Sequence, residues 1–218
     1  MKNIRRIVWP VVIMVLLLGL LGCSKDTTPE NNVAFISANE NLEYEKVYKE
    51  LGLGVLYDFD FKLPYADQSW VNIWVEGYQN GQKMDPFHLI ELSYGKSPQQ
   101  VEEGHMGFGL INPISEAGSI FMYSHNVKAP PIRIDNQILN NSASFNVWDY
   151  AIGSEKVSLE SGETKLLAVY RQGKNNTIEG FDYQDSQAMD KMIKKDAVVL
   201  LLKVKVVKED EAEGDNDV

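Results

Sequence analysis

The chain has 218 residues, 44% of them hydrophobic, and a formal net charge of −10 at pH 7. Such an acidic chain repels phosphate backbones, so we expect no nucleic acid partner. It contains a single cysteine, which excludes an intramolecular disulfide and a multi-thiolate metal site. We therefore predict a domain held together by its hydrophobic core alone, with no cofactor and no bound metal.

The first 23 residues have the order of a targeting segment. Three basic residues come first: Lys2, Arg5 and Arg6. An apolar run follows over 7–21, which is shorter than the ~20 residues that a membrane-spanning helix needs. Gly22 then precedes Cys23, and the chain becomes polar directly afterwards. The stretch Leu20-Leu21-Gly22-Cys23 resembles the signal of a bacterial lipoprotein.

This resemblance implies a modification and a location. In bacterial lipoproteins the cysteine thiol carries a diacylglycerol, the chain is cut before that cysteine, and the new amine is usually acylated, for example with palmitate. The resemblance therefore implies a signal peptide over 1–22 and a lipidated N-terminus at Cys23. The protein would lie on the extracytoplasmic face of the cell membrane, with the membrane as its partner through the lipid. From the residues alone, an uncleaved membrane anchor and an ordinary secretory signal cut elsewhere remain alternatives.

The segment after the cysteine is polar and rich in turn-forming residues. We predict a flexible tether over 23–42, with a candidate short strand at 33–36. A helical period then places four apolar side chains on one face: Tyr44, Val47, Tyr48 and Leu51. We predict a short helix over 43–51 that ends at Gly52.

From residue 55 onward the dominant signal is the alternation of apolar and polar residues. It predicts strands over 55–63, 70–78, 88–94, 106–112, 119–125, 144–151, 165–171 and 198–206. Asn80-Gly81 is a strong hairpin signal, and Pro130-Pro131 and Ser161-Gly162 are expected to be turns. Short strands separated by turns predict an all-β fold over 43–208, an antiparallel β-sandwich of about 8–9 strands.

A second short helix is expected just before the last strand. Asp185 can cap its first turn, and Lys194 and Lys195 complement its C-terminal end. Its apolar face consists of Met189, Met192 and Ile193. Residues 209–218 form an acidic tail, which we expect to be disordered because it has too few apolar residues to fold. A cation or partner site in this tail is the alternative.

The strand over 70–78 carries the candidate ligand-binding residues. They alternate along the strand and so share one face: Trp70, Asn72, Trp74, Glu76 and Tyr78. Such a face suits sugars or peptides, because C–H groups stack on indole rings and polar groups bond to Asn and Glu. Trp148 stands in a similar row with Asn146 and Tyr150, which would extend the surface if the two strands are neighbours. The alternative is that these aromatic side chains pack under a helix, a loop or the second sheet.

Signals for catalysis and metal binding are weak. The three histidines, His88, His105 and His125, lack the i, i+4 spacing of a zinc protease. Asp58 and Asp60 lie on the outward face of one strand, where they could contribute to a weak calcium site or simply be solvated. The G-x-S-x-G motif of a serine nucleophile does not occur. We therefore name no catalytic residue and no metal ligand from the sequence.

Three functions remain open. The favoured one is a lipid-anchored, non-catalytic binding or scaffold module of the cell envelope, with a protein, a peptide or a glycan as its partner. The alternative is an envelope hydrolase whose carboxylate or histidine site is assembled across strands. The third is a structural envelope protein that joins an assembly through sheet edges or loops. An exposed aromatic strand face would favour glycan or peptide binding, whereas a buried one would leave only the scaffold role.

Overall fold

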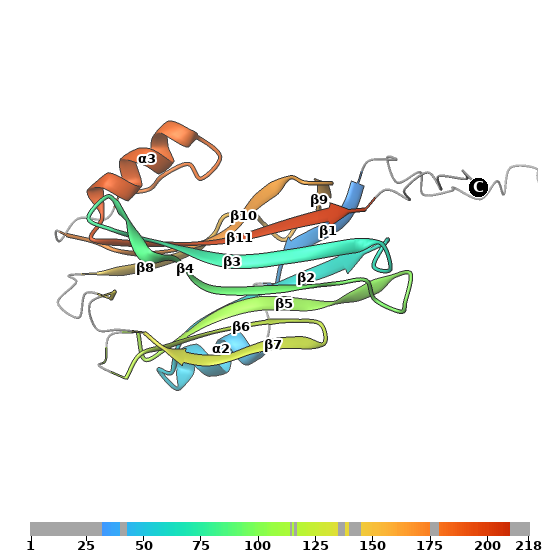
Figure 1. Ribbon diagram of the computed structural model, residues 1–218. Helices are drawn as coiled ribbons and strands as arrows, with labels where there is room; N and C mark the ends of the chain where they lie inside the picture. Colours follow the sequence, from blue (N-terminus) through green and yellow to red (C-terminus); the bar gives the residue numbers. More distant parts are fainter. Residues whose placement is uncertain are drawn as a thin grey trace, which may run out of the picture. The chain divides into compact units, whose positions relative to one another are not determined.

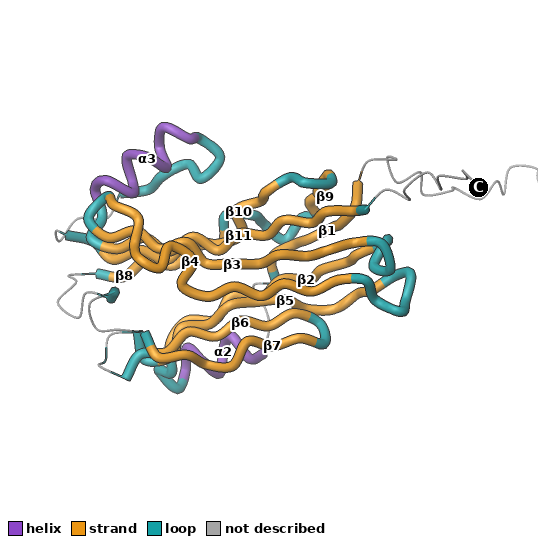
Figure 2. The backbone as a smooth tube through the Cα atoms, in the orientation of Figure 1, coloured by secondary structure: helices purple, strands orange, loops and turns teal. Residues whose placement is uncertain are grey.

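The computed structural model describes residues 32–39, 43–113, 115, 117–134, 138–139, 145–174 and 179–209. These residues form two antiparallel sheets that pack face to face, so the predicted all-β sandwich is confirmed, with 11 strands in place of the expected 8–9 (Figure 1, Figure 2). The six-stranded sheet has the order β7 (Val127–Arg133), β6 (Ser119–Ser124), β5 (Glu102–Ile111), β2 (Gly54–Leu63), β1 (Asn32–Ala38) and β9 (Val157–Glu160). The five-stranded sheet has the order β4 (Gln82–Gly95), β3 (Ser69–Gln79), β11 (Val198–Lys208), β10 (Thr164–Gln172) and β8 (Asn146–Tyr150).

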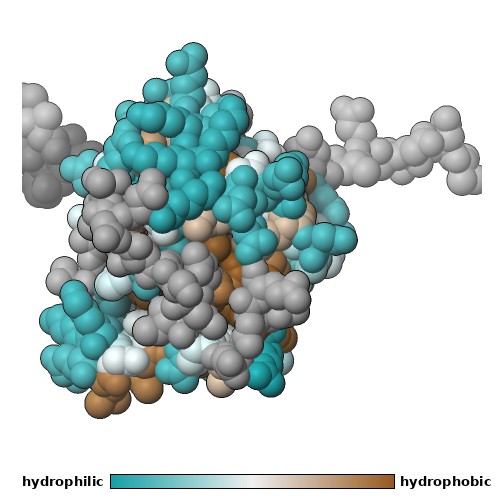
Figure 3. All heavy atoms as spheres, turned by 90° about the vertical axis from the view of Figure 1, so that its left-hand side faces the viewer, coloured by the Kyte–Doolittle hydropathy of each residue, from teal (hydrophilic) through white to brown (hydrophobic). Residues whose placement is uncertain are grey.

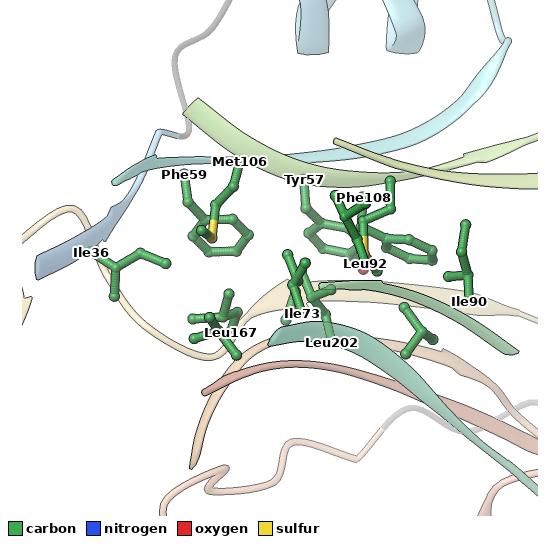
Figure 4. Packing of buried hydrophobic residues seen from close by; sticks show 14 of the residues in the cluster. Ile36, Tyr57, Phe59, Ile73, Ile90, Leu92, Met106, Phe108, Leu167 and Leu202 are labelled. Atoms are coloured by element: carbon green, nitrogen blue, oxygen red, sulfur yellow. The ribbon is translucent and has the colours of Figure 1, made fainter. Parts of the chain in front are cut away.

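The core lies between the two sheets, where their inward side chains meet (Figure 4). Tyr57 and Phe59 of β2 point toward the five-stranded sheet, and Ile73 of β3 and Leu202 of β11 point back toward them. The Tyr57 hydroxyl donates a hydrogen bond to the Val169 carbonyl oxygen at 2.9 Å, which ties the two sheets together. Burial of one face of each sheet is what the alternation of apolar residues encodes.

The first half of the last strand is buried on both faces, because a helix covers its outer side there. Val199 and Leu201 of β11 lie under α3 (Ser186–Lys195), whose Met192 is fully buried. The Asp185 side chain accepts a hydrogen bond from the Gln187 N–H at 2.9 Å, which confirms the predicted N-cap. The exposed surface over this helix is hydrophilic (Figure 3).

The predicted tether over 23–42 is wrong in its C-terminal part. β1 pairs with β2 on one side and with β9 on the other. Its inward residues Ala34 and Ile36 are fully buried. The candidate strand at 33–36 therefore exists and extends over 32–38, because its short apolar run fills a position inside the sheet.

Turn residues were predicted correctly at two places and wrongly at a third. Asn80 and Gly81 have φ of 54° and 85°, as a type I′ hairpin requires, and Gly162 has a φ of 82° in the turn between β9 and β10. Pro130 and Pro131 lie within β7 and not in a turn. β7 is the edge strand of its sheet, where the missing N–H of a proline breaks no internal ladder.

The predicted N-terminal helix exists as α2 (Glu43–Glu50), and Gly52 follows it with a φ of 63°. Its apolar face is not buried, since Tyr44 is 68% and Leu51 67% exposed. The Tyr48 ring lies 6.2 Å from the Phe121 ring on the outer face of β6. Hydrophobic side chains are accordingly exposed along the lower edge in Figure 3. Neither helix that the structure describes is long and apolar enough to cross a membrane.

Candidate functional site

The predicted binding face of β3 is partly closed by its own hydrogen bonds. Trp74 is only 9% and Glu76 only 7% exposed. Trp74 Nε1 donates to Glu76 Oε1 at 3.0 Å, and Lys203 Nζ and the Tyr78 hydroxyl donate to Oε2 at 2.8 and 3.3 Å. Burial alone would raise the pKa of Glu76, but the hydrogen bonds from Lys203 and Trp74 outweigh it and lower this pKa. Both carboxylate oxygens are thus already occupied.

The ends of the same row have different surroundings. Tyr78 packs into the apolar cluster beneath α3, and Asn72 is half-buried. Trp70, at the other end, keeps 40% of its surface exposed. The row therefore presents one open indole ring, and the continuous aromatic platform expected from the sequence does not form.

Trp148 lies neither beside this row nor on the same face of the sheet. Its strand β8 is separated from β3 by β10 and β11. Trp148 is paired with Tyr170, and Tyr150 of the same face packs edge-on against Tyr57 at 5.4 Å in the core. The Trp148 row thus lies on the inward side of its sheet, where Trp148 itself remains 45% exposed, whereas Trp70 and Trp74 lie on the outward side. The combined surface proposed from the sequence is therefore wrong, because strand pairing is not encoded in the alternation itself.

The structure brings together three other residues on the outer face of the six-stranded sheet. Asp58 and Asp60 belong to β2, and His105 of β5 is paired with Asp60. His105 Nδ1 lies 3.0 Å from Asp58 Oδ1 and 3.4 Å from Asp60 Oδ1. Across the described part of the chain, no three His, Cys, Asp or Glu side chains are arranged to hold a metal ion. The two aspartates of β2 are directed at an imidazole ring.

Asp58 is the fixed point of this cluster. It is 1% exposed and accepts hydrogen bonds from Asn39 Nδ2 at 3.1 Å, from His105 Nδ1 and from the Tyr123 hydroxyl. Burial raises the pKa of Asp58, and the hydrogen bonds from Tyr123 and His105 oppose that rise. The contact through Nδ1 orients the imidazole, whose side chain is 51% exposed, and leaves Nε2 available for a ligand.

Glycines in β5 allow Tyr123 to reach the buried carboxylate. A Cβ atom at Gly107 would lie 2.5 Å from the Tyr123 hydroxyl, and one at Gly109 would lie 2.2 Å from the Phe121 ring. The two side chains of β6 therefore lie flat over bare backbone, as aromatic residues often do over glycines in sheets. The sequence signal for this close approach of aromatic rings to the β5 backbone is the pair of alternate glycines inside the predicted strand.

An open pocket of about 410 Å³ adjoins the imidazole. Lys62 and Glu103 form an ion pair of 2.5 Å at its rim. Burial in the sheet leaves Ser37 of β1 only 7% exposed at its floor. The lining comes from β1, β2, β5 and the residue before β9: Phe35, Ser37, Asp60, Phe61, Lys62, Glu103, Gly104, His105 and Lys156. Sequence spacing alone could not place His105 beside Asp58 and Asp60 or reveal this pocket, because the residues come from distant segments.

The predicted signal peptide over 1–22, the lipidation site Cys23 and the tail from residue 210 lie outside the described residues. Of the candidate sites, the pocket beside His105 and the closed row on β3 lie within the described residues. Comparison with known protein families, curated proteins and solved structures finds no match to this chain.

Proposed function

We propose that this protein is a lipid-anchored, non-catalytic binding module on the extracytoplasmic face of a bacterial cell membrane. Its ligand would be a small polar component of the envelope, of the peptide or glycan class, bound in the pocket beside His105. The order of residues 1–23 supports the anchor. The pocket supports the binding role, and the aromatic row of β3 no longer contributes to it.

One observation carries the binding role: the polar groups of the pocket are held in place before any ligand arrives. Asp58 is fixed by Asn39, Tyr123 and His105, and it in turn orients the imidazole toward the pocket. Preorganised groups lose little conformational entropy on binding, so a modest number of contacts gives useful affinity. A volume of about 410 Å³ lies within the range of small-ligand sites.

Calorimetric titration tests this role directly. The mature, lipidated protein in detergent micelles is titrated with soluble muropeptides, alongside His105→Ala and the control His88→Ala, an exposed histidine on the other sheet. We expect binding by the wild type, about tenfold weaker binding by His105→Ala, and no change in the control, since one hydrogen bond to a charged group is lost. Absence of binding by the wild type, or equal binding by His105→Ala, would contradict the proposal.

A hydrolase is the second candidate, and the Asp58–His105 pair is what favours it. A carboxylate that orients Nδ1 leaves Nε2 able to take a proton from water while the hydroxide adds to a carbonyl carbon. Ser37 is two strands away from His105, about 9–10 Å between backbones, so the attacking group would be water. The test is p-nitrophenyl acetate hydrolysis by the wild type and by His105→Gln, which should be slower by roughly 10²–10⁴. Equal rates would exclude this candidate.

A further inference from the structure

The charged groups around the pocket are not all matched within the protein. Lys62 and Glu103 neutralise each other at 2.5 Å. Asp58 is satisfied by three side-chain donors. This leaves one anion, Asp60, and one cation, Lys156, on the pocket wall.

The imidazole of His105 satisfies only part of the hydrogen-bonding capacity of Asp60. The single Nδ1–H of His105 lies closer to Asp58, at 3.0 Å, than to Asp60, at 3.4 Å. A hydrogen bond at the longer distance is weak, and no second donor to Asp60 occurs among the described residues. Its side chain is 59% exposed, so the carboxylate faces the pocket with most of its hydrogen-bonding capacity unused.

Lys156 is the complementary group. It forms no ion pair with any residue that the structure describes. Lys156 lines the pocket, and its charge contributes, after the hydrogen bond and charge of Lys62, to lowering the pKa of Glu103. An exposed ammonium group that lines a pocket and forms no ion pair there is suited to an anionic group of a ligand.

Strand register places these groups in one row. Val157 is paired with Ile36, so continuing the register by one residue sets Lys156 opposite Ser37. Ser37 is itself paired with Asp60, and Asp60 with His105. The cation and the anion therefore stand two strands apart, about 9–10 Å between backbones, with a serine hydroxyl between them. Phe35, on the same face of β1, supplies an apolar wall about 6.6 Å along the strand.

We propose that this row binds a zwitterionic ligand, a short peptide with a free ammonium and a free carboxylate. The ammonium bonds to Asp60, the carboxylate to Lys156, and the Ser37 hydroxyl and the Phe35 ring contact the part between. A dipeptide spans at most about 7 Å, so the two charged side chains close the remaining distance. This inference rests on the proposed function, since it names the ligand class of the same pocket.

The test compares three forms of one dipeptide at pH 7 by calorimetry, with the mature lipidated protein in detergent micelles. The probes are glycylphenylalanine, its N-acetyl form without the ammonium, and its amide without the carboxylate. We expect the wild type to bind the zwitterion about tenfold or more tightly than either blocked form. Asp60→Asn should remove the discrimination against the acetyl form only, and Lys156→Gln the discrimination against the amide only. The exposed residues Asp67 and Lys128 provide the controls Asp67→Asn and Lys128→Gln, which should behave as the wild type.

Equal affinity for all three forms, or variants that behave as the controls, overturns the zwitterion inference. Muropeptide binding without dipeptide binding also overturns it, and leaves the pocket as a ligand site. Absence of binding by muropeptides and dipeptides alike overturns both the inference and the proposed function. Each substituted side chain is exposed, so the variants should unfold at the same temperature as the wild type.

Discussion

His105 Nδ1 lies 3.0 Å from Asp58 Oδ1, across the pairing of β2 with β5. The two partners have opposite surroundings, because Asp58 is 1% and the His105 side chain 51% exposed. A buried carboxylate can fix the orientation of a ring, while the exposed ring remains free to meet a ligand. This division of roles makes the outer face of the six-stranded sheet the leading site of the molecule.

The Tyr123 hydroxyl should stabilise the fold in a pH-dependent way. Tyr123→Phe removes a hydrogen bond to Asp58, so the already raised pKa of Asp58 rises further. We expect a loss of about 1–2 kcal/mol in the free energy of unfolding at pH 7. The loss should shrink as the pH falls through this raised pKa toward 3.8, because the folded protein then holds Asp58 protonated.

Urea unfolding at pH 7 and pH 4 measures this loss of stability for Tyr123→Phe. Tyr44→Phe on the exposed face of α2 is the control, and a loss equal at both pH values would contradict the argument.

The contribution of Glu76 to stability should also be lost as the pH falls. Glu76→Gln leaves the Lys203 ammonium without its carboxylate partner at the outer face of β3. We expect a loss of roughly 1–3 kcal/mol at pH 7. The folded-state pKa of Glu76 is lowered below its ordinary 4.5, so its stabilisation is present above that value and is lost as the pH falls through the lowered pKa. Thermal unfolding between pH 7 and pH 3 tests this. Glu91→Gln, on an exposed side chain, should cost much less, and an equal cost would refute the role of burial.

The glycines of β5 should not tolerate a side chain. Gly109→Ala would place a Cβ atom 2.2 Å from the Phe121 ring, so the ring must move. We expect a loss of about 1–3 kcal/mol, which denaturant unfolding can measure. Gly153→Ala is the matched control, because nothing lies within 4 Å of its added Cβ atom. Combining Gly109→Ala with Phe121→Ala should recover part of the loss, and failure to do so would point to another cause.

The proposed anchor depends on the one thiol of the chain. Cys23→Ala should abolish incorporation of labelled palmitate and move the protein from the membrane fraction to the soluble fraction, because no lipid can be attached. It should also block removal of residues 1–22, which gel mobility reports. Ser24→Ala, next to the cysteine, is the control. Unchanged processing and membrane association of the cysteine variant would show that the resemblance to a lipoprotein signal is misleading.

Several elements could be predicted because their signals are local. The Asn80-Gly81 turn needs only two residues that accept positive φ, and the cap at Asp185 needs one side chain within reach of the next turn. The apolar alternation of β11 likewise reports its buried face without reference to other strands. The exposed face of α2 was not predictable, because helical periodicity shows that apolar residues share a side and not what that side meets.

By itself, the sequence determined an acidic chain with a lipoprotein-like start, a two-layer β domain, and the positions of its two described helices and of the turns at Asn80-Gly81 and Ser161-Gly162. Only the tertiary structure decided which strands are neighbours. That pairing set Trp148 on the opposite face of its sheet from Trp70 and Trp74, and it placed Asp58, Asp60 and His105 in one cluster. The reason is physical: side-chain alternation follows from local backbone geometry, whereas pairing and register follow from long-range packing of the two sheets.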